Sequence, residues 1–384
     1  MKKILISLFI TVFLFSPIIV KGDEVDLAPG AKSAVLLEPT TGEILYEKNS
    51  HEKYSPASMT KMMTMLLVME HLEGGGFKLD DMIKISENAS SMGGSQIYLE
   101  TGESMSVEDL IKGVAIASGN DAAVALSEAI SGSEELFVQR MNERAKELGL
   151  KNTNFKNPTG LDEANHYSTA YDMSMIAREL VSHENILKYT SIYEDYLRPN
   201  TDKKVWLVNT NKLVRFYDGV DGLKTGYTTE AGYCLTATAK RGNLRLIAVV
   251  MGEEDSKVRN AEISKMLDYG FSTREIEKLL TTDSNLGYVK VEKGKLKKVE
   301  INPLENINVL NRKGLPKRNV TYKLSLNVLK APIKKGDNIG SLDIIEDDKV
   351  INRIGVTVKE DVKKASILNL FTRYFNELFN GEIS

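Results

Sequence analysis

Hydrophobic and polar positions follow two different patterns along the chain, and the change between them falls shortly after residue 271. Before this point, apolar stripes with helical spacing alternate with short runs rich in β-branched residues, which predict helices and antiparallel strands. The strands expected in this part are 34–37, 44–46, 233–238 and 244–251. The helices expected are 58–73, 105–117, 121–130, 137–148, 168–182 and 258–269.

The stretch 288–358 contains only short alternating runs, of which 320–328 is the clearest, and glycine, proline and lysine separate them. Runs of strands without helices indicate an all-β unit. We therefore expect a small separate β-sandwich or barrel without obvious chemistry, and we expect the boundary to fall within 272–285.

The N-terminus has the pattern of an export signal. Lys2 and Lys3 precede the apolar run 4–15, which is typical of a secretory signal peptide. We expect residues 1–22 to be this signal, cut before Asp23, with an uncleaved anchor as the alternative. In either case the mature protein is expected at the outer face of the cytoplasmic membrane or in the cell wall.

The spacing of apolar and polar residues in 361–384 predicts a helix with a broad apolar face. Its polar side consists of Asn369, Arg373, Asn376 and Glu377. The apolar face consists of Ile367, Leu368, Leu370, Phe371, Tyr374, Phe375, Leu378 and Phe379. A helix of this kind can lie in a membrane interface, so we expect a membrane-surface anchor. Packing against the β-rich part or against a partner is the alternative.

Composition narrows the function classes. The chain has 384 residues, of which 42% are hydrophobic and 27% charged, so it is globular and long enough for two domains. Its net charge of -3 gives no reason to expect a nucleic-acid partner. The single cysteine, Cys234, excludes an intramolecular disulfide and a multi-cysteine metal site, and we interpret it as a core residue.

Ser58 and Lys61 are the first candidates for chemistry, because residues three apart share one face of a helix. The lysine amine could accept the serine proton if burial lowered its pKa. Ser-x-x-Lys is a common pattern that an ordinary helix start also produces, and 50–53 fits it as well. Pro56 before the helix and the glycines 74–76 after it favour Ser58.

Two further triplets follow in the chain. Ser118-Gly119-Asn120 lies between two predicted helices, where a plain helix–helix turn would contain the same residues. Lys224-Thr225-Gly226 lies on a predicted strand beside the 233–251 hairpin. Glycine would let a ligand approach the strand backbone, and the lysine and threonine would offer a cation and a hydroxyl. An exposed lysine at a strand end is the structural alternative.

The order of these triplets in an exported chain resembles the penicillin-recognising serine acyltransferases, and more specifically the low-molecular-mass penicillin-binding proteins, which are serine D-alanyl-D-alanine carboxypeptidases. Further segments resemble that family: 118–122, 157–161, 224–228 and 267–271. The resemblance implies an α+β fold. A β-lactamase-like catalytic domain at 23–275, an antiparallel sheet packed with helices, would precede an all-β domain at 285–360 and the amphipathic helix at 361–384.

The resemblance also implies the reaction. The enzyme would remove the terminal D-alanine from peptidoglycan stem peptides ending in D-Ala-D-Ala, without a metal or other cofactor, and β-lactams would acylate it as covalent inhibitors. Ser58 would attack the carbonyl carbon of the penultimate D-alanine, and Lys61 would be the general base. Ser118 would relay protons and protonate the leaving D-alanine. DD-endopeptidase action on cross-links stays open.

Substrate-binding roles carry over in the same way. Asn120 would hold the substrate amide, and Lys224 and Thr225 would bind the terminal carboxylate beside Gly226. The backbone N–H groups of Ser58 and Tyr227 would form the oxyanion hole. Some members of the family have histidine where this chain has Tyr227, so the deacylation rate and its pH dependence are expected to differ.

Arg259 is at the position of the family's carboxylate-binding arginine; an arginine on a helix surface is the alternative. Two other classes compete with the carboxypeptidase. A class A β-lactamase would need a deacylating glutamate and an aspartate where this chain has Gly119. A non-catalytic wall-binding protein would not need the intact set of triplets.

Overall fold

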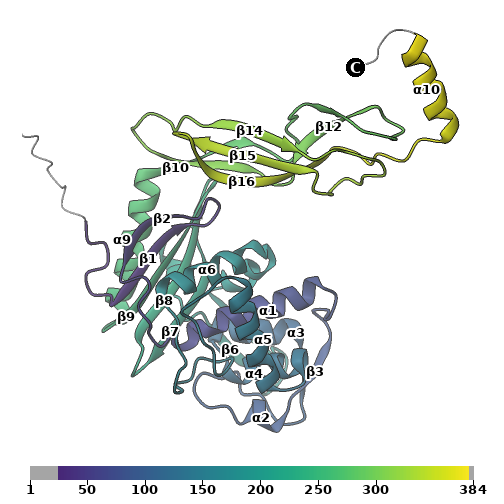
Figure 1. Cartoon of the computed structure of the whole chain (residues 1–384). Helices are drawn as coiled ribbons and strands as arrows, with labels where there is room; N and C mark the ends of the chain where they lie inside the picture. Colours follow the sequence, from purple (N-terminus) through teal and green to yellow (C-terminus); the bar gives the residue numbers. More distant parts are fainter. Residues whose placement is uncertain (1–24, 380–384) are drawn as a thin grey trace, which may run out of the picture.

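The computed structural model describes residues 25–379, so the expected signal segment 1–22 lies outside the described residues. An α+β unit is followed by an elongated β-rich unit, and a helix ends the described chain (Figure 1). This order of units is the one that the sequence pattern predicted.

A five-stranded antiparallel sheet organises the α+β unit, with the strand order β2-β1-β9-β8-β7. Both hairpins expected from the sequence are present in it. The bounds of the strands are Ser33–Glu38 for β1, Glu43–Lys48 for β2, Val220–Thr228 for β7, Gly232–Arg241 for β8 and Leu244–Glu253 for β9. Two short ribbons lie outside the sheet: β3 (Met82–Lys84) with β4 (Ser104–Ser106), and β5 (Glu194–Leu197) with β6 (Val205–Val208).

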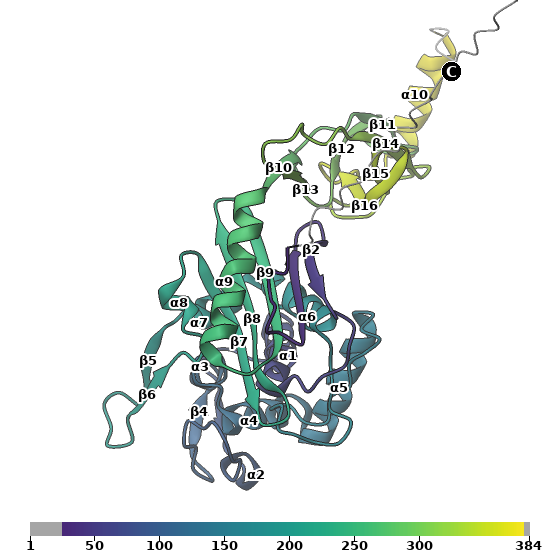
Figure 2. The ribbon, with the colours of Figure 1, turned by 90° about the vertical axis from the view of Figure 1, so that its left-hand side faces the viewer.

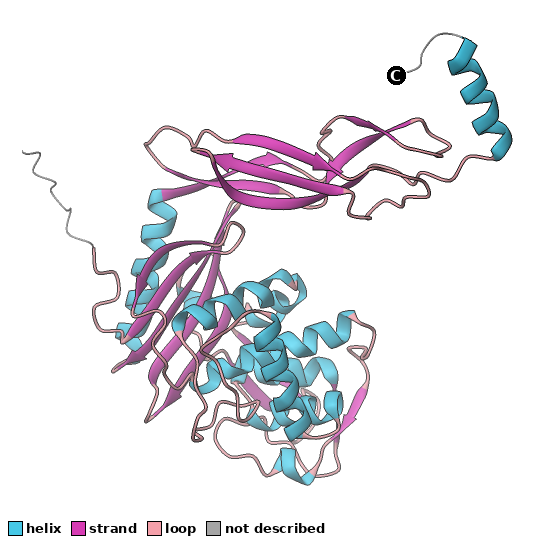
Figure 3. Cartoon of the chain, viewed as in Figure 1, coloured by secondary structure: helices cyan, strands magenta, loops and turns pink. Residues whose placement is uncertain are grey.

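Strand β9 is buried on both faces because helices cover both sides of the sheet. Ile247 and Val249 belong to the core beneath α6, whereas Ala248 and Val250 belong to the core beneath α9. Figure 2 shows α9 lying along one face, and Figure 3 shows most of the other helices of the α+β unit on the opposite side. The short helix α8 is an exception, because its Leu213 belongs to the core beneath α9. The helices are α1 (Lys61–Glu73), α2 (Glu87–Ser90), α3 (Val107–Ala117), α4 (Asn120–Ser131), α5 (Glu134–Glu147), α6 (Ala170–Ser182), α7 (Leu187–Thr190), α8 (Leu213–Phe216) and α9 (Ser256–Thr273), with two 3-10 turns, η1 (Ala57–Thr60) and η2 (Glu184–Ile186).

The β-rich unit has its own hydrophobic core and begins directly after α9. Strand β10 (Arg274–Leu280) pairs with β13 (Ile307–Arg312), so strand structure starts earlier than the expected residue 285. A second sheet has the order β11-β12-β16-β15-β14. Its strands are Tyr288–Lys290, Lys298–Pro303, Lys349–Val358, Gly340–Glu346 and Thr321–Leu326 in that order.

The terminal helix α10 (Ile367–Phe379) projects from the end of the β-rich unit that is remote from the α+β unit (Figure 1). The chain is fixed to the β-rich unit just before it, because Val362 pairs with Ile333 and the Ala365 N–H donates to the Lys293 carbonyl. The apolar side chains of Ile367, Leu368 and Phe371 are exposed rather than packed on that unit. Among the helices of residues 25–379, none combines the length and apolarity that crossing a membrane requires.

Candidate active site

Ser58 lies in the tight turn η1, and α1 begins only at Lys61. The Met59 N–H donates to the Pro56 carbonyl at 3.1 Å, which closes the turn. Ala57, immediately before the serine, is fully buried and has a left-handed backbone with φ of 46°. This conformation costs a non-glycine residue about 1–3 kcal/mol, and it persists only where surrounding packing enforces it.

Two glycines let neighbouring backbone pack directly against this turn. A Cβ added to Gly226 of β7 would lie 2.8 Å from the Pro56 carbonyl oxygen and 3.1 Å from the Ala57 Cβ. A Cβ added to Gly160, which has φ of +83°, would overlap the Ala57 carbonyl. The Lys224 strand and the 157–161 turn therefore both meet the turn that carries Ser58.

The Lys61 amine is completely buried and contacts three oxygen atoms. Its Nζ lies 2.6 Å from Asn120 Oδ1, 2.7 Å from the Thr159 carbonyl oxygen and 3.1 Å from Ser58 Oγ. A neutral amine has two protons and one lone pair, and only Ser58 among these three partners has a proton to give. If two N–H groups donate to Asn120 and Thr159, the lone pair faces the Ser58 hydroxyl.

The surroundings favour that neutral amine. Burial lowers the pKa of Lys61 well below its ordinary value, and the positive charge of Lys224 lowers it further, while Asp121 acts in the opposite direction. The same burial that makes an ammonium costly favours the unprotonated amine, which is the form that can accept a proton.

The two groups that hold the amine are themselves fixed. Asn120 Nδ2 donates to the Gly93 carbonyl at 2.7 Å, which turns its Oδ1 toward Lys61. The Asn157 side chain accepts from the Gly160 N–H at 2.7 Å and shapes the turn that presents the Thr159 carbonyl. Sequence reasoning did not identify Thr159 as a contact, because its backbone oxygen, which any residue has, makes the interaction.

Lys224 is also fully buried, on the edge strand β7 of the sheet. Its Nζ donates to the Thr225 carbonyl at 2.9 Å, and the Thr225 hydroxyl bonds that of Thr210 at 2.7 Å. Burial, and then the positive charge of Arg259, lower the pKa of Lys224 to about 7. The exposed strand-end lysine that the sequence left open as an alternative is not found.

Arg259 is buried on α9, with 5% of its surface exposed, so it is not an arginine of the helix surface. Its Nη1 donates to the Cys234 carbonyl at 3.3 Å, and its Nε and Nη2 donate to Asn260 Oδ1. Cys234 is a buried core residue, as expected.

The remaining predicted residues lie on the same elements. Ser118 is buried and left-handed, with φ of 64°, where it ends α3 and precedes α4. The Tyr227 side chain is exposed and stacks on Tyr233 with ring centroids 4.3 Å apart.

Within residues 25–379, one group of side chains has metal-ligand spacing: Glu70, Glu179 and His183. Arg144 already donates to Glu70 at 2.7 Å and to Glu179 at 2.6 Å. The arginine supplies the positive charge there, and we assign the group no metal.

The chain is similar to known proteins along most of its length. Residues 22–255 match a family model described as D-alanyl-D-alanine carboxypeptidase, and residues 275–364 match one described as penicillin-binding protein 5, C-terminal domain. The D-alanyl-D-alanine carboxypeptidase DacF of Bacillus subtilis is 53% identical over 97% of this chain and 98% of its own length. The crystal structure of penicillin-binding protein 5 from Haemophilus influenzae has a TM-score of 0.71 and 35% identity, covering 87% of this chain and 98% of its own. Penicillin-binding protein D2 from Listeria monocytogenes, solved in an ampicillin-bound form, has a TM-score of 0.58 and 32% identity, covering 64% of this chain and 100% of its own.

Proposed function

Because this chain belongs to the family of serine D-alanyl-D-alanine carboxypeptidases, we propose that Ser58 is the nucleophile with which it removes the terminal D-alanine of peptidoglycan stem peptides. The observation that supports this assignment most directly is the buried Lys61 amine, placed 3.1 Å from Ser58 Oγ and held by two further oxygen atoms.

In the acylation step, the Lys61 amine takes the proton of Ser58 as Oγ attacks the carbonyl carbon of the penultimate D-alanine. The backbone N–H groups of Ser58 and Tyr227 stabilise the negative oxygen of the tetrahedral intermediate; one such donor contributes roughly a hundred- to a thousandfold in rate. The Ser118 hydroxyl then protonates the nitrogen of the leaving D-alanine and recovers a proton from Lys61. The C–N bond breaks, and an ester on Ser58 remains.

Water hydrolyses this ester, releases the shortened peptide as a carboxylate and restores the Ser58 hydroxyl. Asn120 holds the substrate amide, while Lys224, Thr225 and Arg259 supply the positive charge and the hydroxyl for the terminal carboxylate. A β-lactam acylates the same hydroxyl when its ring amide opens, and the leaving nitrogen stays attached to the adduct.

The proposal is tested by intact-protein mass spectrometry after incubation with a β-lactam, together with D-alanine release from a peptide ending in D-Ala-D-Ala. With the β-lactam, we expect one long-lived adduct that maps to the peptide containing Ser58. With the D-Ala-D-Ala peptide, we expect one D-alanine to be released for each peptide that is cleaved. Rapid β-lactam hydrolysis without a stable adduct would instead favour the β-lactamase alternative, and an adduct on another residue would contradict the assignment of Ser58.

The pKa of Lys224 leads to a pH prediction. Its ammonium form, which attracts a carboxylate, is populated below about pH 7 and is lost above it. We compare kcat/KM for a peptide with a free terminal carboxylate and for the same peptide with a terminal amide, because the contribution of the Lys61 base cancels in the ratio. The preference for the carboxylate should fall roughly three- to tenfold between about pH 6 and about pH 9.

The control for this experiment is Lys224→Gln, which has no titrating group at that position. The preference of this variant for the carboxylate peptide over the amide peptide should be low and constant across the same pH range. A wild-type ratio that does not change with pH would remove Lys224 from carboxylate recognition.

The enzyme acts outside the cytoplasm, and we propose that residues 1–22 direct its export and that α10 binds the outer face of the cytoplasmic membrane. Support for the anchor comes from its exposed Ile367, Leu368 and Phe371, and from its position at the remote end of the β-rich unit (Figure 1). An apolar helix face of this kind gains free energy by entering the headgroup region.

Removal of residues 366–384 should shift the enzyme from the membrane fraction to the soluble fraction with D-alanine release unchanged. The cut belongs at 366 rather than 361, because Val362 and Ala365 are buried in the β-rich unit. Fractionation and vesicle sedimentation measure the shift, with Ile333→Ala, which perturbs the β-rich core but keeps the helix, as the control. Unchanged fractionation of the truncated chain would refute the anchor.

A further inference from the structure

The segment 93–99 determines how the Asn120 side chain is oriented. The Gly93 carbonyl accepts from Asn120 Nδ2 and the Ser95 carbonyl accepts from the Asn120 backbone N–H, each at 2.7 Å. Further along, the buried Asp121 carboxylate accepts from the N–H groups of Ile97 and Leu99, at 3.0 and 3.1 Å. Bonds from α4 therefore hold the segment at both of its ends.

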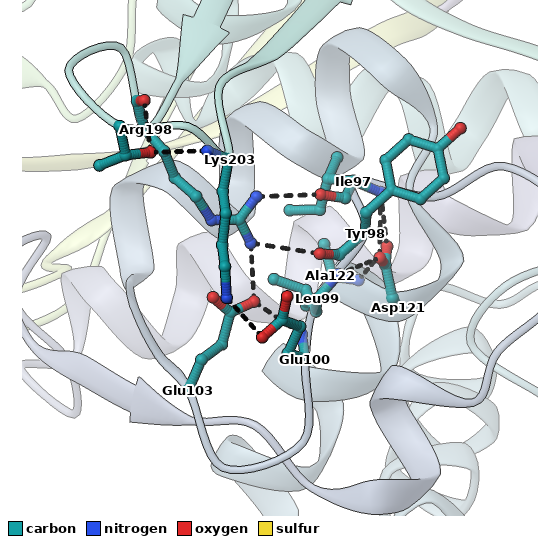
Figure 4. A network of polar contacts seen from close by, with 10 residues as sticks. Ile97, Tyr98, Leu99, Glu100, Glu103, Asp121, Ala122, Arg198 and Lys203 are labelled. Atoms are coloured by element: carbon teal, nitrogen blue, oxygen red, sulfur yellow. Dashed lines mark hydrogen bonds and ion pairs between the residues drawn. The ribbon is translucent and has the colours of Figure 1, made fainter.

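Arg198 reaches the same segment from the opposite side. It lies at the end of β5, outside the sheet, and its side chain is mostly buried. Its Nη1 donates to the Ile97 carbonyl at 3.2 Å, and its Nη2 donates to the Tyr98 carbonyl at 3.4 Å and to Glu103 at 2.6 Å. Figure 4 shows the guanidinium on one side of the 97–99 backbone and Asp121 on the other.

Two residues at this contact have an unfavourable backbone conformation. Tyr98 and Arg198 both have left-handed backbones, with φ of 58° and 49°. Such a conformation costs a non-glycine residue about 1–3 kcal/mol and is retained where surrounding bonds fix it. If the bonds from Arg198 were lost, the Tyr98 backbone could relax, and the carbonyls of Gly93 and Ser95 could shift with it.

We propose that Arg198 is a positioning residue for acylation, which acts by holding segment 93–99 and thereby the Asn120 amide against Lys61. This inference rests on the function proposed above. Arg198 does not contact the Ser58–Lys61 pair; it acts through Ile97 and Tyr98, then Asn120, whose Oδ1 accepts from Lys61 at 2.6 Å. Displacing one of the acceptors that orient the amine turns its lone pair away from the serine hydroxyl.

Arg198→Ala should lower the second-order rate constant for acylation by a fluorescent penicillin by roughly tenfold, since small misplacements of reacting groups have effects of this size. Arg198→Lys keeps a positive charge for Glu103 but lacks the planar fork that spans two carbonyls. Compared with Arg198→Ala, the lysine variant should therefore have a melting temperature closer to that of the wild type, but its acylation rate should stay low. Equal recovery of both would mean that only the charge matters, and would overturn the proposal.

The matched control is Lys203→Ala. Lys203 lies in the turn that joins β5 and β6, and it pairs with Glu100 at 2.6 Å. Both side chains are exposed, and the lysine does not touch the 97–98 carbonyls (Figure 4). Because exposed pairs contribute little, this variant should acylate at the wild-type rate. An Arg198→Ala rate that matches the Lys203→Ala rate would refute the positioning role.

A double-mutant cycle separates positioning from general destabilisation. If Arg198 acts through Asn120, the Arg198→Ala effect should largely disappear in an Asn120→Ala background. The same rate loss in both backgrounds would contradict the proposal. Failure of the wild-type protein to be acylated at all would instead count against the proposed function, so the two outcomes are distinguishable.

Discussion

Ser58→Ala should abolish both the β-lactam adduct and D-alanine release while leaving the melting temperature nearly unchanged. Among residues 25–379, the hydroxyl has one hydrogen-bond partner, Lys61, whose amine keeps Asn120 and Thr159 as partners when the serine is gone. Losing one bond whose partner stays satisfied costs only about 1 kcal/mol. Intact mass and calorimetry measure the two effects.

The sequence itself supplies the control, because 50–53 has the same Ser-x-x-Lys spacing. The Ser50 hydroxyl donates to Glu47 at 2.6 Å, so a carboxylate and not an amine is its partner. Ser50→Ala should be acylated like the wild type. A Ser58→Ala protein that still gains the mass of the β-lactam would end the assignment.

Lys61→Met should slow acylation by a factor on the order of 10² to 10⁴, the range typical for loss of a general base. Methionine has a similar length and no amine, so Ser58 keeps its position but loses the group that accepts its proton. Asn120 Oδ1 and the Thr159 carbonyl lose a donor, at a cost of about 1–3 kcal/mol each, which burial of the apolar methionine partly offsets.

Stopped-flow fluorescence with a reporter penicillin measures this rate. Lys61→Met should lose the part of the rise in rate with pH that deprotonation of the Lys61 amine gives the wild type. Lys53→Met, at the exposed lysine of the other Ser-x-x-Lys pattern, is the control and should behave as wild type. Acylation of Lys61→Met within a few-fold of the wild type would assign the base to another group.

The sequence predicted much of the α+β unit, because its periodicities are clean. β9 alternates between two cores, and the glycine-ended helix after Ser58 is unambiguous. Strand β10 was missed because 274–280 carries charges at a spacing that does not alternate, and the partner that makes it a strand lies at 307–312. Non-local pairing of this kind leaves little trace in a local pattern.

The candidate site was predicted through its side chains and missed where backbone makes the contact. The spacing of Ser58 and Lys61 implied their proximity, and the structure brings Asn120 to the same amine. The Thr159 carbonyl and the left-handed Ala57 have no side-chain signature. Arg198 was missed for a different reason, since its acceptors are carbonyls in a segment about a hundred residues earlier.

The backbone packing at Gly160 and Gly226 has a consequence for how this enzyme could diversify. Both glycines meet the main chain of the turn that carries the nucleophile, so neither position can accept a larger residue without moving that turn. The exposed side chain of Tyr227, next to Gly226, has room to vary instead. Steric exclusion therefore restricts substitution where the nucleophile is held, whereas an exposed neighbouring side chain is not restricted in this way.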